Sequence, residues 1–213
     1  MNEPAASLGS TIAATIRQWV VEGRLQPGQR LSEKQLTEQL EVSRNTLREA
    51  FRLLTQQGLL THIPYAGVMV ARPDLAAIID IYRVRRLIEC QAVMEALPHH
   101  PAIARMEQAV EHARAAREAH AWLTVGSANI DFHRALVSLT DSPRINAMYA
   151  DLCAELRLAF GLVADPARIH APYIEGNSAI VELIKRGENQ QAAIQLDAYL
   201  QKSERSLLAV YTG

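Results

Sequence analysis

The 213-residue sequence has only two cysteines, few aromatic side chains and no long apolar run. Cys90 and Cys153 are too few for a disulfide-stapled scaffold, and their apolar surroundings are typical of buried, reduced thiols. No apolar stretch approaches the ~18 residues that a membrane-spanning helix requires. The N-terminus also lacks a basic segment followed by an apolar one, and we expect residues 1–7 to be a frayed leader. We therefore expect a cytoplasmic protein with no membrane partner.

An excess of charge of one sign is also missing. The net charge of −1 excludes a strongly basic protein that coats nucleic acid without regard to sequence. Residues 1–72 contain eight Lys and Arg against six Asp and Glu, whereas the remaining residues contain 14 against 17. The basic side chains are therefore slightly concentrated in the first third of the chain, as expected if that part contacts DNA.

Residues 31–70 have the pattern of two short helices joined by a tight turn and followed by a β-hairpin. Ser32 is placed to cap the first helix and Ser43 the second, and Gly58 follows the second helix as a terminating residue. Two β-capable runs within residues 59–71 flank a Pro-Tyr-Ala-Gly connection. This order of elements predicts a winged helix-turn-helix, a DNA-binding module.

The outer side of the second helix carries Arg44, Asn45, Arg48 and Arg52. Such donors suit phosphates and the edges of bases. Taken alone, they also fit an ordinary amphipathic helix with a solvated arginine face. The capped first helix, the turn and the hairpin favour the DNA-binding interpretation.

The segment from Ile12 to Val70 resembles the N-terminal domain of the GntR family of bacterial transcription regulators. The resemblance is carried by Pro27-Gly28 and by the run VSRNTLREA that begins at Val42. Two positions depart from the family pattern, since Glu41 replaces the usual turn glycine and the wing tip lacks arginine. The resemblance implies DNA contacts at Lys34, Ser43, Arg44, Asn45, Thr46 and Arg48, with Tyr65 and Gly67 at the wing tip.

The second part of the chain is rich in Ala and has little strand signal, which predicts an antiparallel helical bundle. We place the domain boundary at Arg72-Pro73, giving a DNA-binding domain at 1–72 and a helical domain at 73–213. The fold class is therefore mainly α, with one small hairpin. The six expected helices lie near 75–96, 101–118, 120–140, 143–163, 170–186 and 189–210.

The helical domain resembles the FCD effector domain of the FadR subfamily, in its six-helix VanR-type branch. The matching motifs are VRRLIE at 84–89, DFHRAL at 131–136 and the closing stretch 180–200. This resemblance implies a homodimer in which the helical domain supplies much of the interface, and a pocket for a small effector.

Many FCD domains hold a divalent metal with one Asp and three His. The corresponding positions here are Asn129, His133, Asn177 and Tyr199, so one ligand of four is retained. Neutral Asn and protonated Tyr are poor ligands for Zn or Ni. We therefore expect no metal cofactor, and His133 to be a polar residue that lines a cavity or is satisfied within the core.

The same four side chains, with Arg85, are candidates for binding an organic effector without a metal bridge. Arg85 has two interpretations of equal weight: it holds the effector's carboxylate, or it pairs with Glu89 one helical turn on. The sequence contains no nucleophile and base set, phosphate-binding Gly loop or intact metal set, so we expect no enzyme. It predicts a transcription regulator, most simply a repressor, that binds a short inverted repeat in double-stranded operator DNA. The alternative is a regulator whose helical domain only dimerises and has a vestigial pocket.

Overall fold

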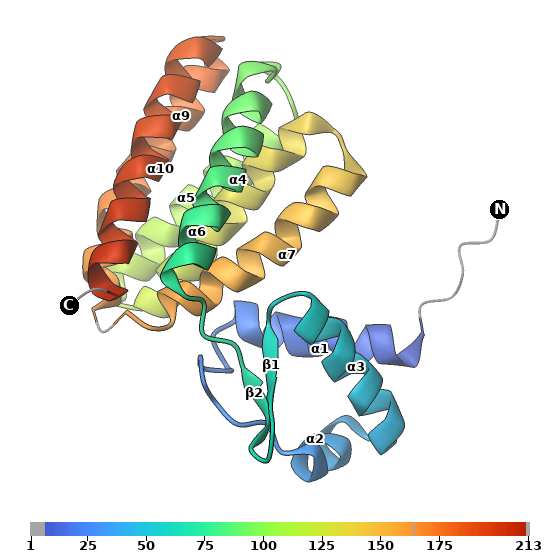
Figure 1. The fold of residues 1–213 in the computed structure, drawn as a ribbon. Helices are drawn as coiled ribbons and strands as arrows, with labels where there is room; N and C mark the ends of the chain where they lie inside the picture. Colours follow the sequence, from blue (N-terminus) through green and yellow to red (C-terminus); the bar gives the residue numbers. More distant parts are fainter. Residues whose placement is uncertain (1–6, 164, 212–213) are drawn as a thin grey trace, which may run out of the picture. The chain divides into compact units, whose positions relative to one another are not determined.

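The computed structural model describes residues 7–163 and 165–211, so most of the expected N-terminal leader lies outside the described residues. The chain divides into two compact units that meet between Arg72 and Pro73 (Figure 1). Each unit has its own core and is described separately. The first contains α1 (Leu8–Val21), α2 (Glu33–Leu40), α3 (Arg44–Gln56), β1 (Leu60–Ile63) and β2 (Gly67–Val70).

Serine caps begin the three helices of the first unit, as the sequence predicts for two of them. The Ser43 hydroxyl accepts a hydrogen bond from the Thr46 backbone N–H at 3.1 Å, and Ser32 does the same for the first turn of α2. The inner faces of α1 and α3 meet in a core whose centre contains Ile16, Leu47 and Leu54, all fully buried. Packing of α3 against both other helices therefore fixes the direction of its outer face.

The turn between α2 and α3 contains Glu41, which stands where the family pattern usually has glycine. This residue has φ +54°, in the left-handed region that favours glycine. Glu41 thus adopts a conformation that glycine reaches without strain, at a cost of about 1 kcal/mol for the Cβ. The helix-turn-helix geometry is kept despite the substitution.

The wing is a two-stranded antiparallel hairpin in which Leu60 pairs with Val70 and Ile63 with Gly67. Tyr65 and Gly67 both have positive φ, +64° and +91°, which closes the connection between the strands. The Tyr65 side chain is fully exposed at the tip.

The second unit is a helical bundle (Figure 1). Its first long helix packs along its last, and its second along its third. The bundle contains α4 (Leu75–Met94), α5 (Ala102–Glu118), α6 (Trp122–Val137), α7 (Pro143–Phe160), α8 (Pro166–His170), α9 (Ile174–Lys185) and α10 (Asn189–Tyr211).

One helix of the bundle differs from the expected pattern. The helix predicted near 170–186 begins later, as α9 at Ile174, and is preceded by the short helix α8 and a 3-10 turn at Ala171–Tyr173. Pro172 lies in this turn, and its missing N–H and fixed φ do not favour a continuous helix. The predicted helix near 120–140 likewise ends in a 3-10 turn, Ser138–Thr140.

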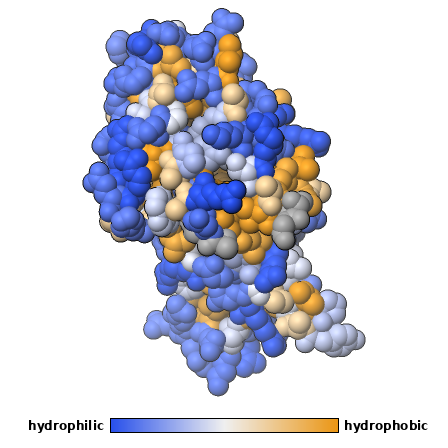
Figure 2. All heavy atoms as spheres, turned by 90° about the vertical axis from the view of Figure 1, so that its left-hand side faces the viewer, coloured by the Kyte–Doolittle hydropathy of each residue, from blue (hydrophilic) through white to orange (hydrophobic). Residues whose placement is uncertain are grey.

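A large cluster of apolar side chains fills the bundle. It includes Tyr82, Phe132 and Leu200, which are fully buried. On the face of the molecule in Figure 2, hydrophobic residues form separate patches among hydrophilic ones, as is usual for a protein surface. Within the described ranges, no helix is long and apolar enough to cross a membrane.

Candidate functional site

The N-terminal half of α3 presents the donors that the sequence predicts for DNA contact. Arg44, Asn45 and Arg48 are all exposed, and Thr46 is partly exposed. The Ser43 and Thr46 hydroxyls lie 2.9 Å apart at the start of the helix. Because the N-terminus of a helix attracts phosphate oxygens, this arrangement suits contact with the DNA backbone.

Arg48 is held in place from the neighbouring helix. Its Nε and Nη2 atoms donate to the carboxylate of Glu33 on α2 at 3.2–3.3 Å. Arg48 remains mostly exposed, so this ion pair orients the guanidinium without removing it from solvent. Lys34, the next residue on α2, is also exposed.

The wing strands and their connection contain no Lys or Arg. Tyr65 and Gly67 occupy the predicted positions, and the Tyr65 side chain is fully exposed. The exposed Arg30 forms a β-bridge with Met69 of β2, and its Nε lies 4.0 Å from the point that a Cβ on Gly67 would occupy. A cation beside the wing tip is therefore supplied by Arg30 and not by the wing itself.

The helical domain contains a buried network of polar side chains at its centre. Asn177 Nδ2 and the Tyr199 hydroxyl both donate to Asn129 Oδ1, at 2.8 and 3.1 Å. The Tyr199 hydroxyl also lies 3.1 Å from His133 Nε2. The four positions identified by resemblance, which come from α6, α9 and α10, are thus brought together as one hydrogen-bonded group.

Glu89 on α4 is the centre of this network. Its carboxylate accepts hydrogen bonds from His133 Nδ1 at 2.7 Å, from the Tyr149 hydroxyl at 2.5 Å and from Arg85 Nε at 2.8 Å. Burial opposes the charged form, but Arg85 and His133 outweigh it and lower the pKa of Glu89 to about 2. Since Glu89 is ionised and accepts only, His133 Nδ1 must carry the donated proton.

The Arg85–Glu89 pair, one of the two interpretations of Arg85, is present in the structure and is 1% and 0% exposed. From the sequence, Glu89 is expected only as a partner of Arg85, and its bonds to His133 and Tyr149 are not predicted. Those bonds join residues 44 and 60 positions apart, so no local pattern could reveal them.

The donor set does not fit the metal that the family resemblance implies. Both His133 nitrogens already have hydrogen-bond partners, and Asn129 Oδ1 accepts two bonds. Burial raises the pKa of Tyr199 well above its ordinary value, so its hydroxyl keeps its proton. Elsewhere in the described part of the chain, no three His, Cys, Asp or Glu side chains are grouped to hold a metal ion.

A second buried histidine lies apart from this network. His170 on α8 is 4% exposed and packs edge-on against the Phe160 ring. Burial, with a smaller contribution from the Arg157 cation, lowers its pKa to about 4. Its Nε2 lies 2.8 Å from the point that a Cβ on Gly126 would occupy, so this glycine is required for the close approach of the ring.

We expect His170 to make the helical domain less stable in mild acid. The unfolded histidine binds a proton below about pH 6.5, whereas the folded one stays neutral down to about pH 4, so stability falls as pH decreases through this window. The expected loss between pH 7 and pH 5 is about 1–2 kcal/mol. Urea unfolding at both pH values measures it, and His170→Leu should show a smaller loss than the wild type. An equal loss in both proteins would contradict the assignment.

Two family models match the chain. Residues 8–70 match "Bacterial regulatory proteins, gntR family", and residues 80–202 match the FCD domain. A putative transcriptional regulator GntR from Rhodococcus sp. RHA1 has a solved structure with a TM-score of 0.91 and 34% identity, covering 97% of this chain and 100% of that one.

Curated relatives are also transcription regulators. The Nta operon transcriptional regulator of Aminobacter aminovorans is 27% identical over 201 residues, which is 91% of each chain. An uncharacterized HTH-type transcriptional regulator of Streptomyces ambofaciens is 39% identical over 83 residues, 39% of this chain. The chain spans only 35% of the length of this second relative.

These matches and the fold define a winged-helix transcription regulator with a helical second domain. The chain belongs to the GntR family of bacterial regulatory proteins and carries an FCD domain. It is a DNA-binding transcription regulator and not an enzyme. The family resemblance and the mainly α fold class expected from the sequence are thereby confirmed.

Proposed function

We propose that the protein is a cytoplasmic repressor that binds a short inverted repeat as a homodimer and responds to a small organic acid. The observation that carries the DNA-binding part is the exposed donor face at the start of α3, beside the wing. Two copies of α3 would enter successive major-groove faces of the repeat. The proposed contacts are Lys34, Ser43, Arg44, Asn45, Thr46, Arg48, Tyr65 and Gly67.

The side chains at the start of α3 differ in chemistry, and we propose a different DNA contact for each kind. Arg44 and Arg48 have the planar donors that recognise guanine edges or clamp phosphates. Asn45 is suited to adenine, whose N6 and N7 atoms match an amide. Ser43 and Thr46 lie at the helix N-terminus and would bind backbone oxygens, which positions the helix without selecting a sequence.

For the effector we propose a site in the buried polar network. Two polar atoms there have no hydrogen-bond partner among the described residues: Arg85 Nη2 and Asn177 Oδ1. An unpaired donor and an unpaired acceptor cost free energy when buried, so a ligand that satisfies both is stabilised. A small organic acid with a carboxylate for Arg85 and a hydroxyl for Asn177 matches this pair. The proposed contacts are Arg85, Asn129, His133, Asn177 and Tyr199.

This site is closed in the structure, because its side chains are at most partly exposed and Arg85 is 1% exposed. Ligand entry therefore requires the helices to separate. A ligand shifts the DNA-binding state only if it binds one arrangement of the protein better than the other. We propose that the acid binds the arrangement with separated helices better and so shifts the protein towards it.

The second candidate is a regulator with a non-sensing, dimerising helical domain. The observation in its favour is that Glu89 already supplies a carboxylate to Arg85. A panel of small hydroxy acids in a thermal-unfolding screen distinguishes the two. The sensor function predicts that at least one acid raises the melting temperature by a few degrees and weakens DNA binding. A domain without a sensor function predicts no shift for any acid.

A further inference from the structure

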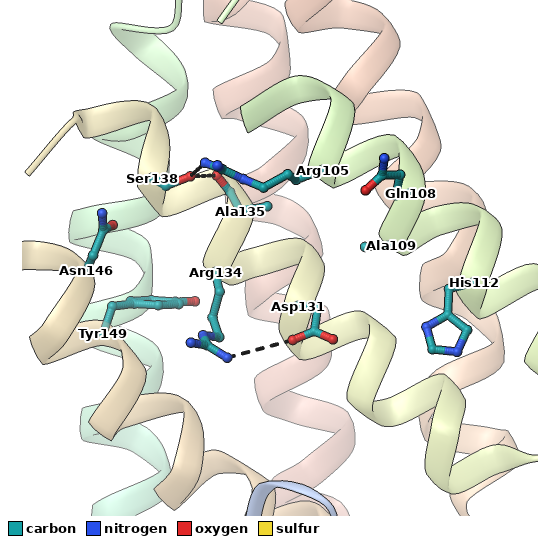
Figure 3. Close-up of a pocket in the computed structure, with 10 residues that line it drawn as sticks. All are labelled: Arg105, Gln108, Ala109, His112, Asp131, Arg134, Ala135, Ser138, Asn146 and Tyr149. Atoms are coloured by element: carbon teal, nitrogen blue, oxygen red, sulfur yellow. Dashed lines mark hydrogen bonds and ion pairs between the residues drawn. The ribbon is translucent and has the colours of Figure 1, made fainter. Parts of the chain in front are cut away.

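A cavity of about 480 Å³ opens on the surface of the helical domain (Figure 3). Neither Asn129 nor Asn177 is among its lining residues. The cavity lies between α5, α6 and α7. Arg105 and His112 line it from α5, Asp131 and Arg134 from α6, and Tyr149 from α7. Its size falls within the range of sites for small molecules.

The charged side chains around this cavity leave an excess of positive charge. Arg105 donates to the neutral Ser138 hydroxyl at 2.6 Å and has no ion pair among the described residues. Arg134 and Asp131 are 3.8 Å apart and about half exposed, so their attraction is weak. The cavity therefore has two guanidinium groups and a single carboxylate.

The rest of the wall combines the polar side chains of Gln108, His112, Ser138 and Asn146 with an apolar part. Ala109 and Ala135 are buried at 7% and 8% exposure, and the Tyr149 ring is almost fully buried. A ligand that combines a negative group with a compact apolar body would contact both the guanidinium groups and this apolar part. A carboxylate matches the guanidinium fork best, and a planar ring matches the Tyr149 ring.

We propose that this cavity binds a small aromatic carboxylate, with its carboxylate between Arg105 and Arg134 and its ring beside Tyr149. Burial raises the pKa of Asp131 in spite of Arg134 and His112, and an anion bound beside this carboxyl would raise its pKa further. The site goes beyond the proposed function, because binding here requires no opening of the bundle. The Tyr149 hydroxyl donates to Glu89, so a ligand beside this ring touches the buried network.

Calorimetric titration of the full chain with benzoate, and with the neutral analogue benzamide, tests this inference. Benzoate should bind saturably at millimolar concentration and at least tenfold more tightly than benzamide. Arg105→Gln and Arg134→Gln should each weaken benzoate binding tenfold or more. Asp131→Asn should strengthen it several-fold, since it removes the only anion in the wall. Arg144→Gln is the matched control, because Arg144 is exposed on α7 outside the cavity, and it should bind as the wild type does.

The arginine variants are expected to weaken benzoate binding and Asp131→Asn to strengthen it. General damage to the fold could explain weaker binding but not stronger binding, so the two results together distinguish the site from misfolding. The inference is overturned if benzoate gives no saturable heat, if benzamide binds equally well or if Arg134→Gln binds like the wild type. DNA binding is measured in a separate experiment with and without benzoate. Saturable binding without an effect on DNA supports the site and counts against its use as a sensor.

Discussion

Replacing Arg44 by Ala is expected to abolish specific DNA binding while leaving the protein folded. Arg44 is the first residue of α3 and is exposed, so its removal disturbs no core contact. Loss of a bidentate contact to a base costs about 1–3 kcal/mol, and the dimer loses it twice. Binding to a site selected by the wild-type protein should therefore weaken by roughly thirtyfold to ten-thousandfold. Fluorescence anisotropy at fixed salt concentration measures the change.

Arg52→Ala is the matched control for this prediction, because it removes the same charge from an exposed position two turns further along α3. The control should lose only the non-specific electrostatic part of the affinity, equally for the selected site and for scrambled DNA. Arg44→Ala should lose discrimination between the two DNAs. Unchanged discrimination in Arg44→Ala would show that Arg44 contacts no base.

The second large effect is expected at Glu89. Glu89→Gln keeps the side-chain volume but leaves the Arg85 cation buried and uncompensated. Breaking a buried ion pair in this way costs about 3–5 kcal/mol. Urea unfolding followed by Trp122 fluorescence in a Trp19→Phe background reports on the helical domain alone, because the chain has only these two tryptophans.

The double variant Arg85→Met with Glu89→Gln is the control for Glu89→Gln. It keeps the same amide facing His133 and Tyr149 but removes the cation that the single substitution leaves unpaired, so it should cost less than the single substitution. In the wild type, the stabilisation by ionised Glu89 is present above about pH 4.5 and is lost as pH falls towards 2. A single variant as stable as the double one would show that the pair contributes no such energy.

The first domain could be predicted from the sequence because its signals are local. Each capping serine lies within three residues of the N–H that it accepts from, and the hairpin turn is marked by Pro64 and Gly67. The left-handed backbone conformation of Glu41 could not be predicted, because a glutamate with positive φ has no distinct pattern in the sequence. It becomes clear only from the turn geometry.

The helical domain shows where sequence reasoning ends. The resemblance placed Asn129, His133, Asn177 and Tyr199 together, and the structure brings them into hydrogen-bonding contact. Glu89 joins this group from another helix, and its surroundings are set by tertiary packing. The surface cavity also depends on three helices at once, so no spacing within one segment predicts it.

We expect the start of α3 to read DNA in a symmetric dimer. The most direct test is selection of binding sites from a random double-stranded library by the full chain, followed by footprinting of the selected DNA. We expect a short inverted repeat with two protected major-groove half-sites, whose base preference changes when Asn45 is replaced by Ala. Selected DNA without two-fold symmetry, or a preference unaffected by Asn45→Ala and Arg44→Ala, would contradict it.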